Sequence, residues 1–289
     1  MNRRSFIYHS TGMLLTLPSF ANERKSKYID NLGIQLYSLR KPLNENLKST
    51  IEEVKKIGYK QVEPYNFPSS KSLEMISRAR DHGMQVNSSH FQWDSLLSPK
   101  TSKSPNFEKI LEIAHKNELT DLVVPYLHTP NRSNLEAYKK TADQLNKGAI
   151  QAKEAGIRLS YHNHAFEFQP LSGGKTGFDV LTRNFSEDMF FELDVFWVKV
   201  GGVNPVAQIN FLKGRISQLH LKDLRKGFQS PNFEKVSPDD FAEIGAGQIP
   251  MHPILKAANL SGVKHCHAEQ DHSPAPLSSM EKSFDFLNG

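Results

Sequence analysis

Carboxylates and imidazoles recur where short apolar segments of this 289-residue chain end. The densest runs are His-Asn-His at 162–164, Glu-Leu-Asp at 192–194, His-Leu-Lys-Asp at 220–223 and His-Ala-Glu-Gln-Asp at 267–271. Residues two apart in an extended segment point to the same side, so each run can present two polar groups together. Asp, Glu and His are ligands for Mn²⁺, Mg²⁺, Co²⁺, Fe²⁺ and Zn²⁺, and they also transfer protons. The pattern therefore predicts one divalent metal ion that assists proton transfer.

Eight short β-rich segments alternate with amphipathic helical segments along the chain. Leu47, Ile51, Val54 and Ile57, for example, recur at helical spacing, and Gly58 ends that helix. The predicted strands are 32–37, 61–63, 84–88, 122–125, 157–162, 189–195, 216–221 and 263–268. This alternation predicts an α/β fold with a single (β/α)₈ TIM barrel, which typically needs ~250 residues. A doubly wound open sheet is the rival, but no glycine-rich phosphate loop follows the first strand.

The elements of a TIM barrel position its chemistry at the C-terminal ends of the strands. Six of the eight predicted strand ends carry ionisable residues: Glu63, His90, His162 with His164, Glu192 with Asp194, His220 with Lys222, and Glu269 with Asp271. Asp194 is the strongest candidate ligand, because a carboxylate in an apolar strand needs a compensating partner. Glu63 is expected either to act as a catalytic base or to pair with a nearby Lys or Arg.

Further candidates surround the expected metal. His164 and Lys222 are predicted to be catalytic groups that contact the substrate or orient a ligand. His90 is a candidate substrate-binding residue, with loop packing as the alternative. Trp197 could line a sugar pocket, although aromatic residues after a strand more often pack against helices. The single cysteine, Cys266, excludes an intramolecular disulfide and a cysteine-rich zinc site.

Four strings resemble the xylose isomerase-like TIM-barrel superfamily and, more narrowly, its sugar phosphate isomerase/epimerase branch. They are Tyr-His-Asn-His-Ala-Phe-Glu-Phe (161–168), Glu-Leu-Asp-Val-Phe-Trp (192–197), His-Leu-Lys-Asp (220–223) and Glu-Gln-Asp (269–271). The resemblance covers roughly residues 30–289. It implies one divalent ion held by Glu, Asp, His and Glu from strands five to eight, and Asp194, His220 and Glu269 match three of these positions. His162 stands where many members have Glu, so the fourth ligand is either catalytic candidate His162 or Glu167. Glu167 is preferred because it keeps the ligand type and charge.

The expected function is divalent-metal-dependent isomerisation or epimerisation of a sugar or keto-sugar. A bound ion would polarise a carbonyl and stabilise an enediolate, while a carboxylate or His moves the proton. Elimination or hydration by a lyase or hydratase on 3-keto-glycosides is a close alternative. A metal-dependent phosphodiesterase is a second alternative, because the superfamily includes an endonuclease that acts on abasic DNA. A non-catalytic sugar-binding barrel is a third.

The first 21 residues differ from the rest of the chain. Arg3 and Arg4 precede Phe6, a short apolar run occupies 13–17, and small residues follow at 19–21. This order is typical of a signal peptide, and the adjacent arginines resemble a twin-arginine signal. We therefore expect export, to the periplasm, with 1–21 as signal, 22–29 as linker and 30–289 as the catalytic barrel. The apolar run is too short to span a bilayer, so no stable membrane insertion is expected.

The formal net charge is +5, which becomes +3 when Arg3 and Arg4 are removed with the first 21 residues. The remaining basic residues are mixed with acidic ones on helical segments, as on an ordinary solvated surface. No nucleic-acid partner is expected from this pattern. The expected partner is a small-molecule sugar substrate, and the sequence leaves a homo-oligomer open.

Overall fold

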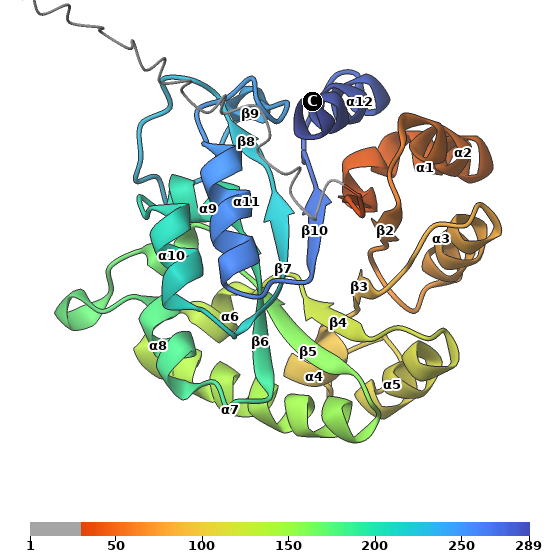
Figure 1. Cartoon of the computed structure of the whole chain (residues 1–289). Helices are drawn as coiled ribbons and strands as arrows, with labels where there is room; N and C mark the ends of the chain where they lie inside the picture. Colours follow the sequence, from red (N-terminus) through yellow and green to blue (C-terminus); the bar gives the residue numbers. More distant parts are fainter. Residues whose placement is uncertain (1–29) are drawn as a thin grey trace, which may run out of the picture.

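The computed structural model describes residues 30–289, so the predictions for the signal (1–21) and the linker (22–29) lie outside the described residues. Eight parallel strands form a nearly closed barrel surrounded by helices (Figure 1), which confirms the predicted TIM barrel. The strands follow one another around the barrel in chain order, and the last lies beside the first. They are β1 (Gly33–Gln35), β2 (Gln61–Glu63), β3 (Ser88–His90), β4 (Asp121–Val124), β5 (Arg158–His162), β6 (Met189–Asp194), β7 (Ile216–Leu221) and β10 (His265–Ala268).

Helices cover the outer face of the barrel, each burying its apolar stripe against the strands. In the second helix, for example, Ile51 and Val54 are fully buried, whereas Glu53 and Lys56 form an exposed ion pair. The helices are α1 (Arg40–Glu45), α2 (Leu47–Ile57), α3 (Ser70–Asp81), α4 (Asp94–Leu97), α5 (Phe107–Lys116), α6 (Thr129–Arg132), α7 (Leu135–Glu154), α8 (Gly177–Asn184), α9 (Val195–Val200), α10 (Pro205–Phe211), α11 (Met251–Leu260) and α12 (Pro276–Asn288). A small antiparallel pair, β8 (Asp223–Leu224) and β9 (Phe241–Ala242), lies outside the barrel sheet.

Three predicted strands differ from the structure. The first was expected at 32–37, but it ends at Gln35, and Leu36–Leu39 forms a 3₁₀ helix. The third strand was expected at 84–88 but is Ser88–His90, because Gln85 makes only an isolated bridge to β2. The sixth strand was expected to include Val195, but the chain enters α9 there. Val195–Val200 has a strand-like composition, yet it folds as a helix because the Asp194 side chain caps its first backbone N–H groups. Neither α9 nor α12 was predicted.

The seam between β2 and β3 has no continuous ladder. The neighbouring pair β1–β2 forms a continuous parallel ladder over three residues of each strand. Across the seam, the backbone of Gln61 and Val62 meets only Gln85, through one isolated bridge that includes the Val62 N–H to Gln85 O bond of 2.9 Å. A second bridge joins Phe67 to Phe91 beyond the strand ends. The backbone N–H of His90 also donates to the Pro64 C=O at 3.0 Å, so separate bridges and single hydrogen bonds close the barrel here.

Apolar and polar side chains alternate along the strands, so that apolar side chains form an outer shell and polar side chains lie inside the barrel. In β7, Leu219 and Leu221 belong to the apolar core, whereas Gln218 and His220 reach polar groups of other strands inside the barrel. Successive side chains of a strand point to opposite faces, so one fully buried strand serves both layers. The polar side chains that point into the barrel gather at the C-terminal end of the strands and form the site described below.

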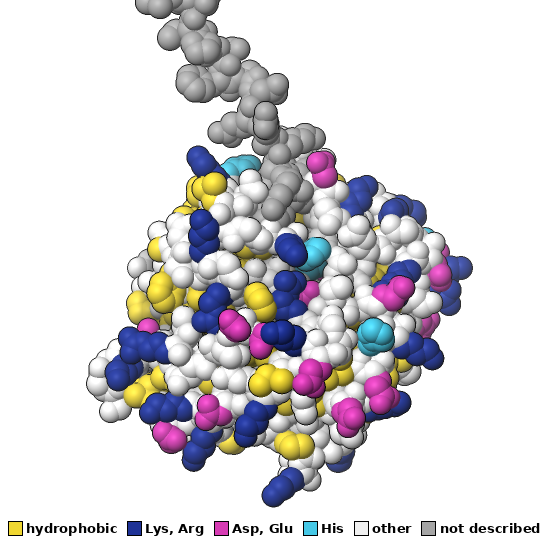
Figure 2. Space-filling model, turned by 60° about the horizontal axis from the view of Figure 1, so that its bottom comes forward, with side chains coloured by type: hydrophobic (Ala, Val, Ile, Leu, Met, Phe, Trp, Pro, Cys, Tyr) yellow, Lys and Arg dark blue, Asp and Glu magenta, His cyan; other side chains and the backbone are white. Residues whose placement is uncertain are grey.

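The surface shown in Figure 2 carries basic and acidic side chains interspersed, without a band of one sign. Among the described residues, no helix is both long and apolar enough to cross a membrane.

Candidate active site

Four ionisable side chains converge at the C-terminal end of the barrel. They come from the ends of neighbouring strands: His162 from β5, Asp194 from β6, His220 from β7 and Glu269 directly after β10. One potential ligand atom from each lies within 4.8 Å of the others. All four residues are at most 3% exposed. The structure thus brings together the three predicted ligands Asp194, His220 and Glu269, with His162 beside them; we call this set the four-ligand cluster.

Asp194 divides its two carboxylate oxygens between the helix and the cluster. Oδ1 accepts hydrogen bonds from the backbone N–H groups of Phe196 (2.9 Å) and Trp197 (3.1 Å) at the start of α9. Oδ2 faces the cluster, 3.2 Å from Nε2 of His162. The backbone of Asp194 is in turn held by the Asn163 side chain, which receives its N–H at 3.0 Å and donates to its C=O at 3.3 Å. The direction of Oδ2 is therefore set by the backbone of two elements.

His220 and Glu269 face each other in a way that suits a shared cation. Nδ1 of His220 lies 2.8 Å from Oε2 of Glu269 without hydrogen-bonding geometry. This buried Nδ1 has no hydrogen-bond partner, and leaving a buried polar atom without a partner is costly. Oε2 of Glu269 also lies 2.8 Å from Nζ of Lys222. Neighbouring donors of an ion held at ~2.1 Å lie about 3 Å apart, which agrees with the spacing of Nδ1 and Oε2. The donor set therefore fits a divalent metal.

Lys222 lies beside the cluster. Its Nζ is 2.8 Å from Oε2 of Glu269, 3.0 Å from Oδ2 of Asp194 and 3.1 Å from Asp271. Burial acts against the ammonium charge, but the three carboxylates outweigh it and hold the pKa of Lys222 well above its usual value. Lys222 therefore remains a cation that can donate hydrogen bonds to an oxygen-rich substrate.

Glu167, preferred from the sequence as the fourth ligand, lies outside the cluster. Its Oε1 accepts a short hydrogen bond from the Tyr161 hydroxyl, and its Oε2 accepts one from the His164 backbone N–H at 2.9 Å. Tyr161 points away from the barrel interior, towards Phe185 in the apolar core. The turn after β5 carries the Glu167 carboxylate to this outer side, so the geometry favours the alternative, His162, as the fourth ligand.

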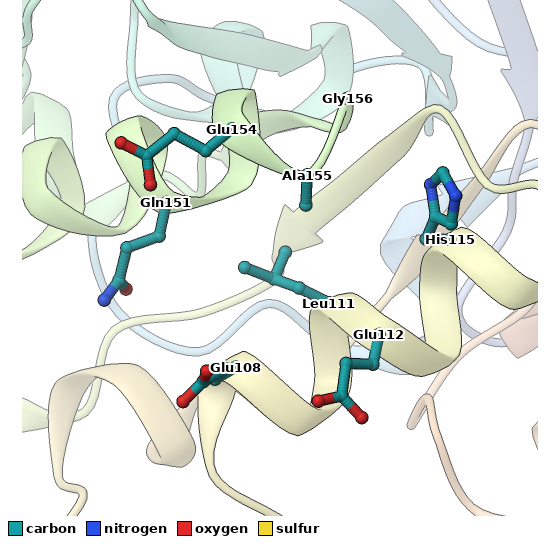
Figure 3. Close-up of a pocket in the computed structure, with 8 residues that line it drawn as sticks. All are labelled: Glu108, Leu111, Glu112, His115, Gln151, Glu154, Ala155 and Gly156. Carbon is teal, nitrogen blue, oxygen red and sulfur yellow. The ribbon is translucent and has the colours of Figure 1, made fainter.

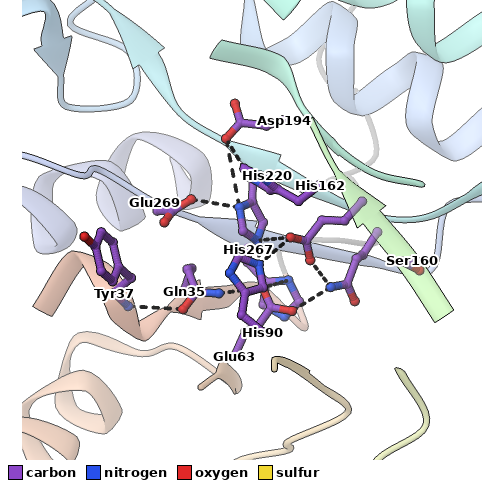
Figure 4. Close-up of polar contacts among 12 residues, drawn as sticks. Gln35, Tyr37, Glu63, His90, Ser160, His162, Asp194, His220, His267 and Glu269 are labelled. Carbon is purple, nitrogen blue, oxygen red and sulfur yellow. Dashed lines mark hydrogen bonds and ion pairs between the residues drawn. The ribbon is translucent and has the colours of Figure 1, made fainter. Parts of the chain in front are cut away.

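Glu63 and His90 lie on the opposite side of His220 (Figure 4). Oε2 of Glu63 is 2.7 Å from Nε2 of His220, and Nε2 of His90 is 2.6 Å from Oε1 of Glu192. Glu63 was predicted as a catalytic residue. The described residues that line the cavity beside the cluster include His90 but not Glu63. Glu63 therefore acts on the site through His220.

His164 follows the cluster on the substrate side. Its ring lies between aromatic neighbours, with its centroid 5.3 Å from Phe166, 5.1 Å from Tyr126 and 5.1 Å from Trp197. Burial, together with the charges of His162 and Lys222, holds the pKa of His164 well below its usual value. The ring is half-buried and lines the cavity, where it can contact a substrate. Trp197 packs behind His164, and its predicted role in substrate binding stays a prediction.

A cavity of about 430 Å³ opens next to the cluster, which is within the range of small-molecule sites. His162, His164, Lys222, Glu269 and Asp271 line its inner part. Aromatic residues from the loops after the first four strands line the rest: Tyr37, Tyr65, Phe91, Trp93 and Tyr126. The cavity therefore combines polar groups at the cluster with apolar rings.

A larger hollow of about 830 Å³ lies on the outer surface between α5 and the end of α7 (Figure 3). Glu108, Glu112 and His115 line it from α5, and Gln151 and Glu154 from α7. It is remote from the C-terminal strand ends that carry the cluster, so the smaller cavity is the candidate active site.

Sequence reasoning missed two groups of cavity residues. Asp271 is two positions beyond Glu269 and was part of a quoted string, but it received no role. Tyr65, Trp93 and Tyr126 follow strands two, three and four at different distances. An aromatic residue in a loop carries no pattern of its own, and only the fold shows that these rings surround one cavity.

A model of the family described as xylose isomerase-like TIM barrel matches residues 51–288. The chain belongs to this family. Curated relatives include the inosose dehydratase of Clostridium beijerinckii, 26% identical over 253 residues, or 78% of this chain and 82% of the relative. The inosose dehydratase of Clostridium botulinum (strain Alaska E43) is 26% identical over 83% of this chain and 88% of its own length.

Solved structures share the fold of this family. A sugar phosphate isomerase/epimerase from Parabacteroides distasonis superimposes with a TM-score of 0.73 at 21% identity, over 94% of this chain and 98% of that one. The IOLI protein, solved with a zinc atom bound, gives a TM-score of 0.67 at 14% identity, over 89% and 98% of the two chains. The chain therefore shares its fold with these proteins, and its buried His, Asp and Glu cluster could bind a metal.

Proposed function

We propose that this protein is a divalent-metal-dependent lyase that removes a carbon-bound proton next to the carbonyl of a keto-sugar and eliminates the group at the β carbon. The observation that carries the proposal is the convergence of His162, Asp194, His220 and Glu269 within 4.8 Å, next to a cavity that also exposes His164 and Lys222. Two imidazoles and two carboxylates form a donor set for Mn²⁺, Fe²⁺, Co²⁺ or Zn²⁺. A bound divalent ion supplies the positive charge that makes a proton next to a carbonyl acidic.

The chain's own residues supply the proton transfers. The neutral ring of His164 lines the cavity and accepts the carbon-bound proton. The electron pair of that bond forms a carbon–carbon double bond as the β-hydroxyl or β-alkoxy group leaves, and the leaving oxygen takes up the proton that His164 has accepted. The ammonium of Lys222 stabilises negative charge that develops on oxygen. The buried cavity limits competition by water.

Two observations favour elimination. The inosose dehydratases of two Clostridium species align with about four fifths of this chain. The aromatic side chains of Tyr65, Trp93 and Tyr126 also offer flat apolar surfaces beside the cluster, which suits the second group of a glycoside. We therefore favour a keto-glycoside, such as a 3-keto-glycoside, as the substrate.

Isomerisation or epimerisation, the first expectation from the sequence, is the second candidate. It begins with the same proton removal, and the proton then returns to carbon instead of a β-group leaving. The four-ligand cluster and Lys222 serve both reactions, so the product distinguishes them.

Phosphodiester cleavage has less support. The described residues form two groups with metal-ligand spacing, and both use His220. An endonuclease of this fold carries more metal ligands than these two groups, which share His220, can supply. The basic and acidic side chains in Figure 2 are interspersed and form no basic band that could bind a nucleic-acid backbone.

The test is turnover of 3-keto-glycosides and of keto- and aldo-sugars in D₂O, with metal-loaded and chelator-treated protein. Elimination predicts an enone product that absorbs in the ultraviolet, whereas epimerisation predicts deuterium at the carbon next to the carbonyl without an enone. His164→Asn should slow either reaction, and His115→Asn on the outer hollow is the matched control that should not. Metal-free protein that works at the full rate would refute the proposal.

A further inference from the structure

A second group of ionisable side chains lies directly beneath the four-ligand cluster. Glu63 and Glu192 contact the edge of His220 that faces away from Glu269 (Figure 4), and His90, which lies 2.6 Å from Glu192, stacks against the His220 ring. One ligand atom from each, with one from His220, also lies within 4.8 Å of the others. Distance alone would therefore permit a second metal ion here, in contact with the first through the His220 ring.

The hydrogen bonds of Glu63 and Glu192, which we call the carboxylate pair, argue against a second ion. Nε2 of Gln218 donates to Oε1 of Glu63 at 2.7 Å and to Oε2 of Glu192. Nε2 of Gln35 donates to Oε2 of Glu63 at 2.9 Å, and Nε2 of His90 lies 2.6 Å from Oε1 of Glu192. All four oxygens of the pair therefore face nitrogen donors, and a cation would have to displace them.

The neighbouring groups fix the direction of both amides. The Gln218 amide lies between two carboxylates, so its NH₂ must face them, because its carbonyl oxygen would meet only other acceptors there. In Gln35 the backbone N–H of Tyr37 donates to Oε1 at 3.1 Å, which turns the NH₂ of this side chain towards Glu63. The interior beneath His220 is thus built to present N–H groups to two buried carboxylates.

His220 completes this set of donors. Its Nε2 is 2.7 Å from Oε2 of Glu63 and 3.1 Å from Oε1 of Glu192. Its Nδ1, on the opposite edge of the ring, is the atom that faces Glu269. A neutral imidazole carries one proton, so a proton held on Nε2 leaves the lone pair on Nδ1.

We propose that the carboxylate pair is a positioning device that keeps the proton of His220 on Nε2 and so presents the Nδ1 lone pair to a single metal ion. Glu63 is the main positioning residue because it makes the shorter contact, and Glu192 supports it. The inference rests on the proposed metal function. It adds that His220 binds the metal as the Nε2–H tautomer, that one ion binds, and that Glu63 and Glu192 hold His220 in this tautomer. Carboxylates that receive the second N–H of a histidine ligand orient the ring and increase its basicity.

The experiment compares Glu63→Gln with Glu167→Gln in the full chain. Both glutamates are fully buried, and both substitutions replace a carboxylate by an amide of the same shape, but only Glu63 contacts His220. Zn²⁺ affinity is measured by competition with a chelating dye, and bound zinc per chain by elemental analysis. Nitrogen-15 NMR of histidine-labelled protein reports which His220 nitrogen carries the proton. Glu63→Asp tests rescue by a shorter carboxylate.

We expect one zinc ion per wild-type chain, with the His220 proton on Nε2. Glu63→Gln should weaken Zn²⁺ binding by about 10–100-fold and reduce the Nε2–H signal, whereas Glu167→Gln should change neither. Glu63→Asp should recover part of the affinity and the Nε2–H signal. If Glu63→Gln does not fold, Glu192→Gln provides the same comparison with a smaller expected loss.

Three outcomes would overturn the inference. Two zinc ions per wild-type chain, one of them lost in Glu63→Gln, would make the lower group a metal site. Wild-type affinity with an unchanged His220 signal in Glu63→Gln would show that the carboxylate pair does not position the ring. No zinc in the wild type would remove both this inference and the proposed function, whereas the first two outcomes leave that function standing.

Discussion

Glu167 gives the protein a pH-dependent stability that one substitution should remove. Burial raises the pKa of its carboxyl from 4.5 to about 7, against the hydrogen bonds from Tyr161 and the backbone N–H of His164. Below about pH 4.5 the group is protonated in the folded and unfolded chains alike. Between these values only the folded chain holds the proton, so the free energy of unfolding falls as the pH rises, and above about 7 the full loss remains.

The size of this loss follows from the shift. One pKa unit corresponds to ~1.4 kcal/mol, so a rise from 4.5 to about 7 costs the folded state ~3 kcal/mol at pH 8. Glu167→Gln keeps an oxygen that accepts from the His164 N–H and offers an NH₂ to the Tyr161 oxygen, but it does not titrate. We therefore expect the variant to gain ~3 kcal/mol relative to wild type between pH 5 and pH 8.

The assay is urea unfolding of metal-free protein at several pH values from 5 to 8, followed by circular dichroism. Glu154→Gln, at an exposed position near the end of α7, removes an equal charge and should leave the wild-type pH dependence unchanged. The reasoning would be refuted if the free energy of unfolding changed with pH in the same way for the wild type and for Glu167→Gln across this range. The opposite trend, with the variant losing stability as the pH rises, would mean that the buried group is a carboxylate stabilised by its partners.

Three further predictions concern function. Glu269→Gln should lose both bound metal and turnover, because an amide removes one negative charge that the ion needs. Elemental analysis and a rate assay measure both, and retained metal and rate would contradict the prediction. His164→Asn should retain the metal but lower kcat by about 100-fold or more, and a normal rate would exclude His164 as the proton acceptor. Replacing both Arg3 and Arg4 by Lys should leave the protein in the cytoplasm, as measured by cell fractionation, and unaltered export would exclude a twin-arginine route.

The sequence predicted the fold because each strand and helix has its own local pattern. The C-terminal ends of parallel strands meet at one end of a barrel, so Asp194, His220 and Glu269 could be expected to lie together without any knowledge of side-chain contacts. The same logic failed for Glu167, which lies in a turn where the side-chain direction depends on contacts to Tyr161. It also missed α9, where one capping side chain overrides a strand-like composition.

The contacts beneath His220 could not be predicted. Glu63 and Gln218 are 155 positions apart and meet only through the closure of the barrel. Whether they meet depends on the register of β2 against β7 across the interior, which no pattern within either strand specifies. A buried glutamine in the sequence carries no sign that it will lie between two carboxylates.

The seam between β2 and β3 has a consequence for how the barrel stays closed. Glu63 belongs to β2 and contacts His220, His90 belongs to β3 and contacts Glu192, and His220 and Glu192 in turn lie 3.1 Å apart inside the barrel. In addition to the backbone hydrogen bonds, the two sides of the seam are therefore connected by side chains inside the barrel. Strands from early and late in the chain share these contacts, so an opening at the seam would disturb the groups around His220 as well as the wall of the barrel.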